Sequence, residues 1–307
     1  MNRLQMTIAH TTLAYTILGI DEIEVVIEMG LSATMGEWWH VANEIAKEHT
    51  VLFYERAGIG GSCASTLSRT PQNIALELKQ LLDLLPHREQ LILIGHSQGG
   101  LYAVQFTRAY PSMVGKLILL DPLSANDDCF KARLTPAEYK LSGVDKGSNV
   151  RTQQRLLRFH MGWLIQKLMK SAPPFYYYPD YSKECQDDIL KQLVNPDLYA
   201  TVLNEYQLAH QDDAIHSLRS KNGFPDVELV LITHSSEKEI AEIRDFGHTT
   251  EETASKIENV WQEIMQDYLS FSTNSRLLRA KNSCHFIHLT DMPLLLEQIQ
   301  LPSNSRI

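Results

Sequence analysis

The hydrophobic residues of this chain follow two alternating patterns. Apolar runs of five to seven residues, typical of strands, alternate with longer stretches that carry apolar residues at helical spacing. The runs predict eight strands, over residues 4–10, 12–18, 24–28, 51–55, 90–94, 116–120, 227–233 and 276–281. Helical spacing predicts helices over 38–47, 70–85, 99–110, 250–269 and 293–300. Continuous apolar strands that alternate with helices favour an α/β fold, with a mostly parallel eight-stranded sheet and helices on both faces.

The middle of the chain departs from this alternation. Between residues 124 and 222 helical spacing dominates, over 151–170, 183–193 and 196–217. We therefore expect residues 1–123 and 223–307 to form one α/β core, with 124–222 as a helical cap (lid) inserted after the sixth strand. Open α/β sheets bind ligands beyond the carboxyl ends of their strands, so the cap is expected to cover a binding site.

Composition and charge exclude several classes of function. The chain carries 28 basic and 37 acidic residues, a net charge of −9, so we expect no nucleic-acid partner. Its four cysteines are scattered without a C-x-x-C pair, so neither a zinc site nor another cofactor is expected. We find no signal-peptide pattern and no apolar run of the ~18 residues that span a bilayer. These features predict a cytoplasmic protein without a membrane span.

The candidate chemistry begins with one motif. The apolar strand predicted at 90–94 runs directly into Gly95-His96-Ser97-Gln98-Gly99, and a helical stretch follows. A G-x-S-x-G motif between a strand and a helix is typical of a nucleophile elbow, in which the serine sits on a sharp turn. The glycines remove Cβ atoms that would obstruct this turn. We therefore predict Ser97 as a nucleophile, with the backbone N–H of Gln98 free to receive an oxyanion.

A serine nucleophile needs a histidine base, and the histidine needs a carboxylate. The loop after the last strand holds His285 and His288, and its position at the same sheet edge as the elbow favours His285. Two carboxylates are possible. Asp121 ends the strand after the elbow strand and is preferred, whereas Glu237 follows the next strand and is the alternative.

The remaining parts of the site are predicted from the loops. A second oxyanion donor is expected after the third strand, where Gly30 permits close approach and the N–H of Leu31 is the candidate. Aromatic residues of the cap, among them Phe159, Trp163 and Tyr176, are candidates for an apolar substrate pocket, although aromatic residues are equally common in cores.

Together these segments resemble the α/β-hydrolase fold superfamily over most of the chain. The segments that carry the resemblance are residues 28–31 (EMGL), 54–62 (YERAGIGGS), 95–100 (GHSQGG), 119–122 (LLDP) and 283–289 (SCHFIHL). The resemblance implies Ser97 as nucleophile and His285 as base. The usual acid of the family follows the seventh strand, near Glu237, whereas the segment around Asp121 is similar to lipases whose acid follows the sixth. The chain departs from the family in having Met29-Gly30 where His-Gly is common.

These observations predict a serine hydrolase, of the carboxylesterase type, that cleaves a small-molecule ester with an apolar acyl or alcohol group through an acyl-enzyme. A thioesterase, amidase, lactonase or C–C hydrolase would use the same three residues and remains an alternative. The alternative from another class is a non-catalytic ligand-binding protein on a hydrolase scaffold.

Overall fold

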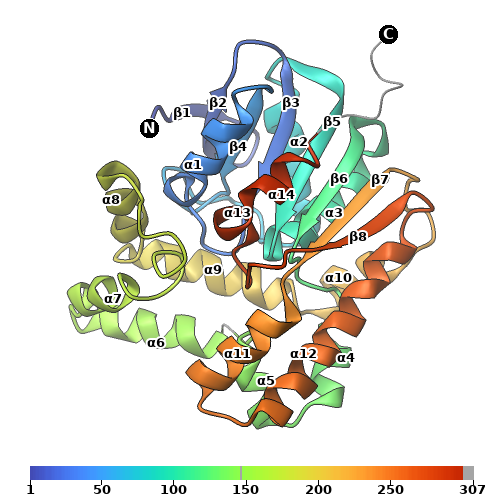
Figure 1. Cartoon of the computed structure of the whole chain (residues 1–307). Coiled ribbons are helices and arrows are strands. Elements are labelled where there is room, and N and C mark those ends of the chain that lie inside the picture. The colour runs from blue at the N-terminus through green and yellow to red at the C-terminus, as the bar shows by residue number, and fades with distance from the viewer. Residues whose placement is uncertain (146, 300–307) are drawn as a thin grey trace.

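The computed structural model describes residues 1–145 and 147–299, which form one eight-stranded sheet with helices on both faces (Figure 1). The strands lie in the order β1-β2-β4-β3-β5-β6-β7-β8. Neighbouring strands from β4 to β8 are parallel, whereas β1 and β2 pair antiparallel at one edge. The bounds are β1 Leu4–Thr7, β2 Thr12–Leu18, β3 Ile23–Glu28, β4 Val51–Glu55, β5 His87–His96, β6 Val114–Leu120, β7 Glu228–Thr233 and β8 Ser275–Arg279. The predicted fold class is confirmed.

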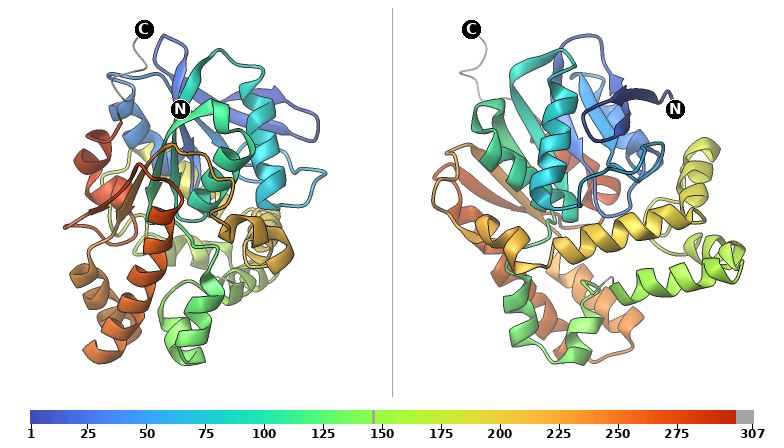
Figure 2. Two further views of the ribbon diagram at one scale, coloured as in Figure 1. Left: turned by 90° about the vertical axis from the view of Figure 1, so that its right-hand side faces the viewer. Right: turned by 180° about the vertical axis from the view of Figure 1, so that it is seen from behind.

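The central strands are apolar on both faces because both faces are covered. Along β5, Leu91 and Leu93 join one core while Ile92 and Ile94 join the other. The first core lies under α2 (Pro71–Leu82) and α3 (Gln98–Ala109). The second lies under α1 (Met35–Ile45), α13 (Ile287–Thr290) and α14 (Met292–Leu296). Figure 1 shows α1, α13 and α14 in front of the sheet, and the reverse view in Figure 2 shows the other layer.

Seven helices lie between β6 and β7 in the described part of the chain. Their bounds are α4 Asp127–Arg133, α5 Pro136–Leu141, α6 Gly147–Arg158, α7 Gly162–Met169, α8 Lys183–Gln192, α9 Pro196–Leu208 and α10 Asp212–Arg219. The single helix expected over 151–170 is divided into α6 and α7. His160 between them has a φ of 56°, and a left-handed residue cannot continue a right-handed helix. The helix expected over 196–217 is likewise divided into α9 and α10.

The helices that follow β7 pack against the insertion as well as the sheet. They are α11 (Ser236–Gly247), which was not predicted, and α12 (Glu251–Met265), which continues into the 3₁₀ turn η2 (Gln266–Ser270). Lys256 of α12 forms an ion pair with Glu138 of α5 at 2.8 Å. Figure 1 accordingly shows α4, α5, α11 and α12 together below the sheet. A boundary at residue 222 therefore separates helices that are in contact.

The last described helix and the longest apolar stretches also bear on the predictions from sequence. The helix expected over 293–300 corresponds to α14, and Gln300 lies outside the described residues. Within the described residues, no helix combines the length and hydrophobicity that crossing a bilayer requires. Another short 3₁₀ turn, η1 (Pro111–Met113), links α3 to β6.

Candidate active site

Ser97 occupies a strained turn between β5 and α3. Its φ of 53° and ψ of −126° are unusual for a residue with a side chain. The turn depends on backbone contacts that only glycine permits. A Cβ atom on Gly99 would lie 2.2 Å from the carbonyl oxygen of Glu28, and one on Gly95 would lie 2.7 Å from Cα of Gly100. The glycines of the motif therefore allow α3 to pack directly onto the end of β3 while the serine side chain projects from the turn.

The three side chains predicted from sequence form a chain of two hydrogen-bond contacts, with His285 in the middle. Nε2 of His285 is 3.0 Å from Oγ of Ser97, and Nδ1 of His285 is 2.6 Å from Oδ2 of Asp121. Asp121 lies directly after β6, and His285 lies between β8 and α13. The alternative acid, Glu237, is exposed in the first turn of α11. The structure thus brings Asp121, and not Glu237, to the imidazole.

Asp121 has a second histidine partner that sequence reasoning missed. The backbone N–H of His234 donates to Oδ1 at 3.1 Å, and Nδ1 of His234 lies 2.8 Å from the same oxygen. On the other side of the ring, Nε2 of His234 lies 2.9 Å from Oε2 of Glu258 in α12. The ring is stacked on Trp261 with the centroids 4.1 Å apart. His234 therefore joins two buried carboxylates behind the Ser97 site.

The charges of this buried group stabilise one another. Burial raises the pKa of Asp121, but the charges and hydrogen bonds of His234 and His285 outweigh burial and hold that pKa well below its usual value. Burial lowers the pKa of His234, but Asp121 and Glu258 outweigh it and raise that pKa well above its usual value. We infer an imidazolium between two carboxylates, with Asp121 ionised and fixed in orientation. The sequence feature that could have indicated this role is the position of His234 directly after β7, at the same sheet edge as the other site residues.

The loop expected to supply the second oxyanion donor lies against the nucleophile. A Cβ atom on Gly30 would lie 3.5 Å from Cβ of Ser97, so the backbone at Gly30 and Leu31 runs beside the serine. Arg56 holds this loop in place, because its guanidinium donates to the carbonyl oxygens of Met29 and Gly30. Gln98 is the first residue of α3, where a backbone N–H has no partner within the helix.

Arg56 also connects the core to the inserted helices. It forms ion pairs with Glu28 of β3 at 2.9 Å and with Glu205 of α9 at 3.0 Å, and all three side chains are buried. Arg69 lies 3.5 Å from the same Glu205 and pairs with Glu77 of α2 at 2.7 Å. This buried network fixes α9 against the loop beside Ser97.

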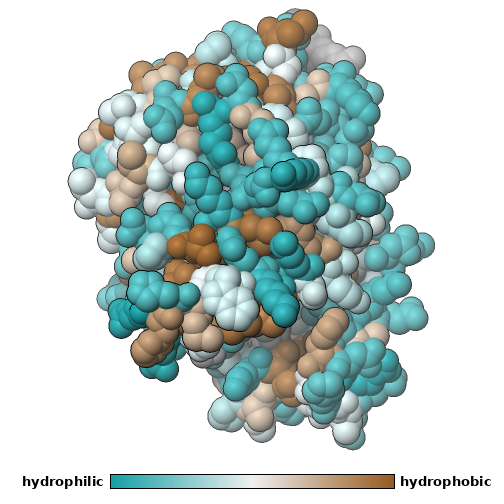
Figure 3. Space-filling model, turned by 90° about the vertical axis from the view of Figure 1, so that its left-hand side faces the viewer, coloured by the Kyte–Doolittle hydropathy of each residue, from teal (hydrophilic) through white to brown (hydrophobic). Residues whose placement is uncertain are grey.

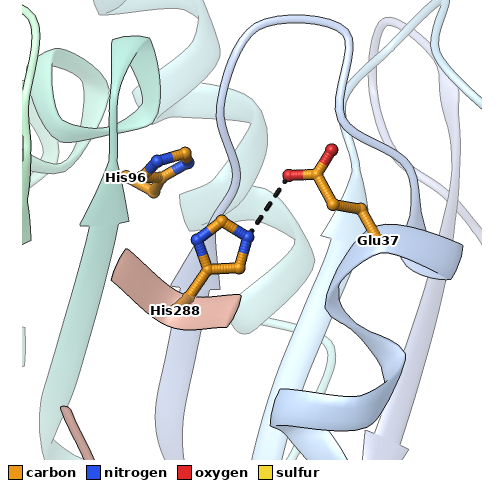
Figure 4. Close-up of side chains that lie close together, drawn as sticks. All are labelled: Glu37, His96 and His288. Carbon is orange, nitrogen blue, oxygen red and sulfur yellow. Dashed lines mark ion pairs between the residues drawn. The ribbon is translucent and has the colours of Figure 1, made fainter. Parts of the chain in front are cut away.

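A further buried cluster, Glu37, His96 and His288, lies next to the site (Figure 4). His96 precedes Ser97, and its Nε2–H donates to the carbonyl of His285 at 3.1 Å. His288 stacks on Trp38 with centroids 4.0 Å apart, and its Nε2 lies 3.4 Å from Oε1 of Glu37. Burial raises the pKa of Glu37 to about 7 and, with the neighbouring histidines, lowers the pKa of His96 and of His288 well below the usual value.

Among the described residues, two groups of buried or half-buried side chains bring together donor types that bind metals. In the first, formed by Glu37, His96 and His288, the candidate ligand atoms lie within 4.8 Å of one another. The second group has the same spread and consists of Glu239, Glu242 and Cys284. A tetrahedral zinc site with bonds of about 2.0–2.1 Å places its ligand atoms about 3.4 Å apart. The 3.4 Å separation of Oε1 of Glu37 and Nε2 of His288 meets that value. The third member, His96, instead uses its Nε2–H to donate to the carbonyl oxygen of His285 and so supports the loop that carries the base.

The three aromatic residues expected to line the pocket are exposed. Trp163 lies in α7, Phe159 lies between α6 and α7, and Tyr176 contacts Phe246 of α11 at 5.6 Å between ring centroids. These positions do not support the expected role, because each side chain points largely into solvent. The neighbouring Tyr177, from the same aromatic run, lies closer to the site.

Tyr177 approaches the site through Phe286. Its ring lies 5.3 Å from that of Phe286, which in turn lies 5.4 Å from the ring of His285. The hydroxyl of Tyr177 donates to Glu242 of α11, which fixes the ring. In the sequence, prolines flank the aromatic run at 173–179, which is typical of a loop, but this pattern could not indicate which ring faces the site.

The comparisons with known proteins agree with this architecture. A family model described as the alpha/beta hydrolase fold matches residues 25–170, which include β3 to β6 and the elbow. The crystal structure of ALR0039 from Nostoc sp. PCC 7120 superposes with a TM-score of 0.71 at 16% identity, covering 97% of each chain. This chain has the α/β-hydrolase fold. The epoxide hydrolase CorEH has a TM-score of 0.67 at 17% identity, covering 96% of each chain, which at this identity shows a shared fold.

Curated relatives of this α/β-hydrolase-fold protein match over part of their length. The abhydrolase domain-containing protein abhd-5.2 of Caenorhabditis elegans is 27% identical over 149 residues, which is 47% of this chain and 34% of the relative. The (lyso)-N-acylphosphatidylethanolamine lipase of Bos taurus is 28% identical over 105 residues, which is 33% of this chain and 31% of the lipase. The matches thus span about a third of each of these relatives.

Proposed function

We propose that this protein is a serine hydrolase that cleaves carboxylic esters through an acyl-enzyme. The observation that carries the proposal is the connected set of Ser97, His285 and Asp121, with distances of 3.0 and 2.6 Å between successive side chains. A serine hydroxyl in contact with an imidazole that is itself held by a carboxylate is the arrangement required for nucleophilic acyl transfer.

In the first half of the reaction, Nε2 of His285 accepts the hydroxyl proton while Oγ of Ser97 bonds to the ester carbonyl carbon. Negative charge moves to the carbonyl oxygen, where the N–H groups of Leu31 and Gln98 would receive it. Asp121 stabilises the imidazolium that has formed. The imidazolium then donates its proton to the leaving alcohol, and the acyl-enzyme remains.

In the second half, water replaces the alcohol. His285 takes a proton from the water as it attacks the acyl-enzyme, and returns that proton to Oγ of Ser97 as the acid leaves. Each donor removed from an oxyanion site of this kind costs about 10²–10³ in rate. The loop that carries Leu31 is held by Arg56, so the site is formed before substrate binds.

The nucleophile separates this proposal from other chemistry on the same fold. Epoxide hydrolase chemistry in this fold proceeds through an aspartate nucleophile, whereas the elbow here carries Ser97. The name of the bovine lipase supports acyl ester hydrolysis. Thioesters, amides, lactones and C–C bonds next to a carbonyl require the same three groups, so these reaction types are alternatives within the proposal.

The inserted helices, residues 124–222, are proposed to act as a cap over the active site. Support comes from the buried contact of Glu205 in α9 with Arg56, because it ties the insertion to the loop beside the nucleophile. The ring of Phe286 lies next to His285, and the ring of Tyr177 lies next to Phe286. These two side chains are the proposed apolar lining of the pocket.

A fluorophosphonate probe tests the proposal directly. We expect the full chain to be labelled at Ser97, and we expect Ser97→Ala to remove both the label and the hydrolysis of a chain-length series of p-nitrophenyl esters. Ser124, buried near the end of β6, provides a matched serine control whose replacement by alanine should leave the labelling intact. Absence of labelling in the folded protein would favour a ligand-binding function instead.

A further inference from the structure

The helices α6 and α7 carry a local charge that is opposite to that of the whole chain. Residues 151–170 contain five basic residues and no acidic residue, although the chain has a net charge of −9. Arg151, Arg155 and Arg158 of α6 are exposed and follow one another at i, i+4 and i+7, so they form one stripe. No ion pair within the described residues involves any of these arginines.

The same segment exposes large apolar side chains. Phe159 is 76% exposed, Trp163 is 62% exposed and Leu168 is 60% exposed. The opposite side of α7 is the packed one, because Ile165 is only 2% exposed. Large apolar side chains in water are unfavourable unless a partner covers them, so their concentration in one short segment indicates an interaction surface.

Basic side chains lie beside these apolar side chains. Lys167 and Lys170 are exposed and follow Trp163 at i+4 and i+7 on one face of α7. Trp163, both lysines and Lys191 line a hollow of about 420 Å³ between α7 and α8, where Asp187 is the acidic residue. Figure 3, which views the side of the molecule that carries these helices, shows hydrophobic and intermediate surface bordered by hydrophilic residues.

This combination matches the chemistry of an anionic lipid surface. Tryptophan, phenylalanine and leucine insert at the boundary between headgroups and acyl chains, while lysine and arginine extend their charged ends to the headgroups. The helices α6 and α7 also form an outer edge of the molecule, away from the sheet, as the views in Figures 1 and 2 agree. A surface on such an edge can meet a flat membrane.

We propose that α6, α7 and the turn between them form a peripheral docking surface for anionic membranes. The occupant is a lipid bilayer that contains acidic phospholipids, and the contact combines insertion of Trp163 and Phe159 with attraction by the arginine and lysine stripes. The proposal concerns binding and does not depend on the catalytic role of Ser97.

Vesicle co-sedimentation of the full chain tests the proposal. We expect binding to vesicles of phosphatidylcholine mixed with phosphatidylserine, much weaker binding to phosphatidylcholine alone, and loss of binding as salt is added. Because Trp163 is exposed in the free protein, its fluorescence should shift to shorter wavelength on the mixed vesicles. Absence of binding to both vesicle types would overturn the proposal.

Matched variants test the two parts of the contact separately. Lys167→Gln should weaken binding to mixed vesicles about fivefold, the contribution of one basic residue at such a surface. The control variant Lys221→Gln, at an exposed lysine after α10, should alter binding to mixed vesicles less than twofold. Trp163→Ser should weaken binding about tenfold or more, whereas Ile20→Ser, at a residue that is 98% exposed beside β2, should not.

Two further results would overturn the assignment. Equal binding by the Trp163 and Ile20 variants would mean that the surface is not inserted in the bilayer. A dimer in solution that Trp163→Ser dissociates, without vesicle binding by either protein, would assign the surface to a second copy of the chain. Circular dichroism and thermal midpoints of each variant provide the control for folding, since all these side chains are exposed.

Discussion

Replacing Asp121 by asparagine should abolish most of the activity because the amide cannot reproduce both contacts of the carboxylate. Oδ1 accepts from the backbone N–H of His234 at 3.1 Å, and a backbone N–H is always a donor. The amide oxygen of asparagine must therefore face His234, which directs its NH₂ group toward Nδ1 of His285. Nδ1 then has to accept, so Nε2 of His285 carries the proton and cannot remove one from Ser97.

The expected size of the effect follows from this loss of the productive tautomer. The corresponding substitution in chymotrypsin-type proteases lowers kcat by about 10⁴, and each factor of ten corresponds to about 1.4 kcal/mol. We therefore expect kcat/KM for a p-nitrophenyl ester to fall by about 10⁴, or about 5.5 kcal/mol of barrier. The matched control is Glu237→Gln, which alters an exposed carboxylate of α11 and should change kcat/KM less than twofold.

The measurement is kcat/KM at neutral pH for wild type, Asp121→Asn and Glu237→Gln, with circular dichroism to show that each is folded. If folded Asp121→Asn kept activity within tenfold of wild type while Glu237→Gln lost a thousandfold, the assignment of the acid would be wrong. A comparable loss in both variants would also contradict the assignment, because an exposed carboxylate of α11 is expected to take no part in the reaction.

Three further predictions concern buried charges. His234→Phe leaves Glu258 buried without its charged partner and should lower the free energy of unfolding by about 3–5 kcal/mol in urea titrations at about pH 6. Because the pKa of His234 is raised in the folded protein, this difference should shrink as pH rises through the folded-state pKa, and a constant difference would contradict the assigned charge. Folded Glu37 keeps a proton up to about pH 7, whereas the unfolded chain releases it near pH 4.5, so the free energy of unfolding of the wild type falls across that window. Glu37→Gln cannot titrate, so its free energy of unfolding relative to wild type should rise by about 3 kcal/mol between about pH 4 and pH 8, measured by calorimetry. An equal difference in Tm between variant and wild type at both pH values would refute this. Glu205→Ala leaves Arg56 without its partner on α9 and should lower the urea midpoint by an equivalent of about 3–5 kcal/mol, whereas an unchanged midpoint would mean that the insertion is not anchored there.

The sequence by itself determined the features that depend on local patterns. β2 and β4 have the bounds that their apolar runs predict, and the sheet is mostly parallel, because a strand covered on both faces must be apolar at consecutive positions. The position of Ser97 was also readable, since only glycine tolerates the backbone contacts around such a turn. The same reasoning placed His285 at the sheet edge that carries Ser97, because loops after parallel strands meet there.

Only the tertiary structure decided which side chains meet across long sequence separations. Asp121 and Glu237 were both acceptable as partners of His285 until the paths of the loops after β6 and β7 were known. The contact of His234 with Glu258 depends on how α12 packs against the sheet, and that of Arg56 with Glu205 on where α9 lies. A residue's own pattern records whether it is buried, but its partner is set by the packing of elements that are distant in sequence, and no local pattern contains that information.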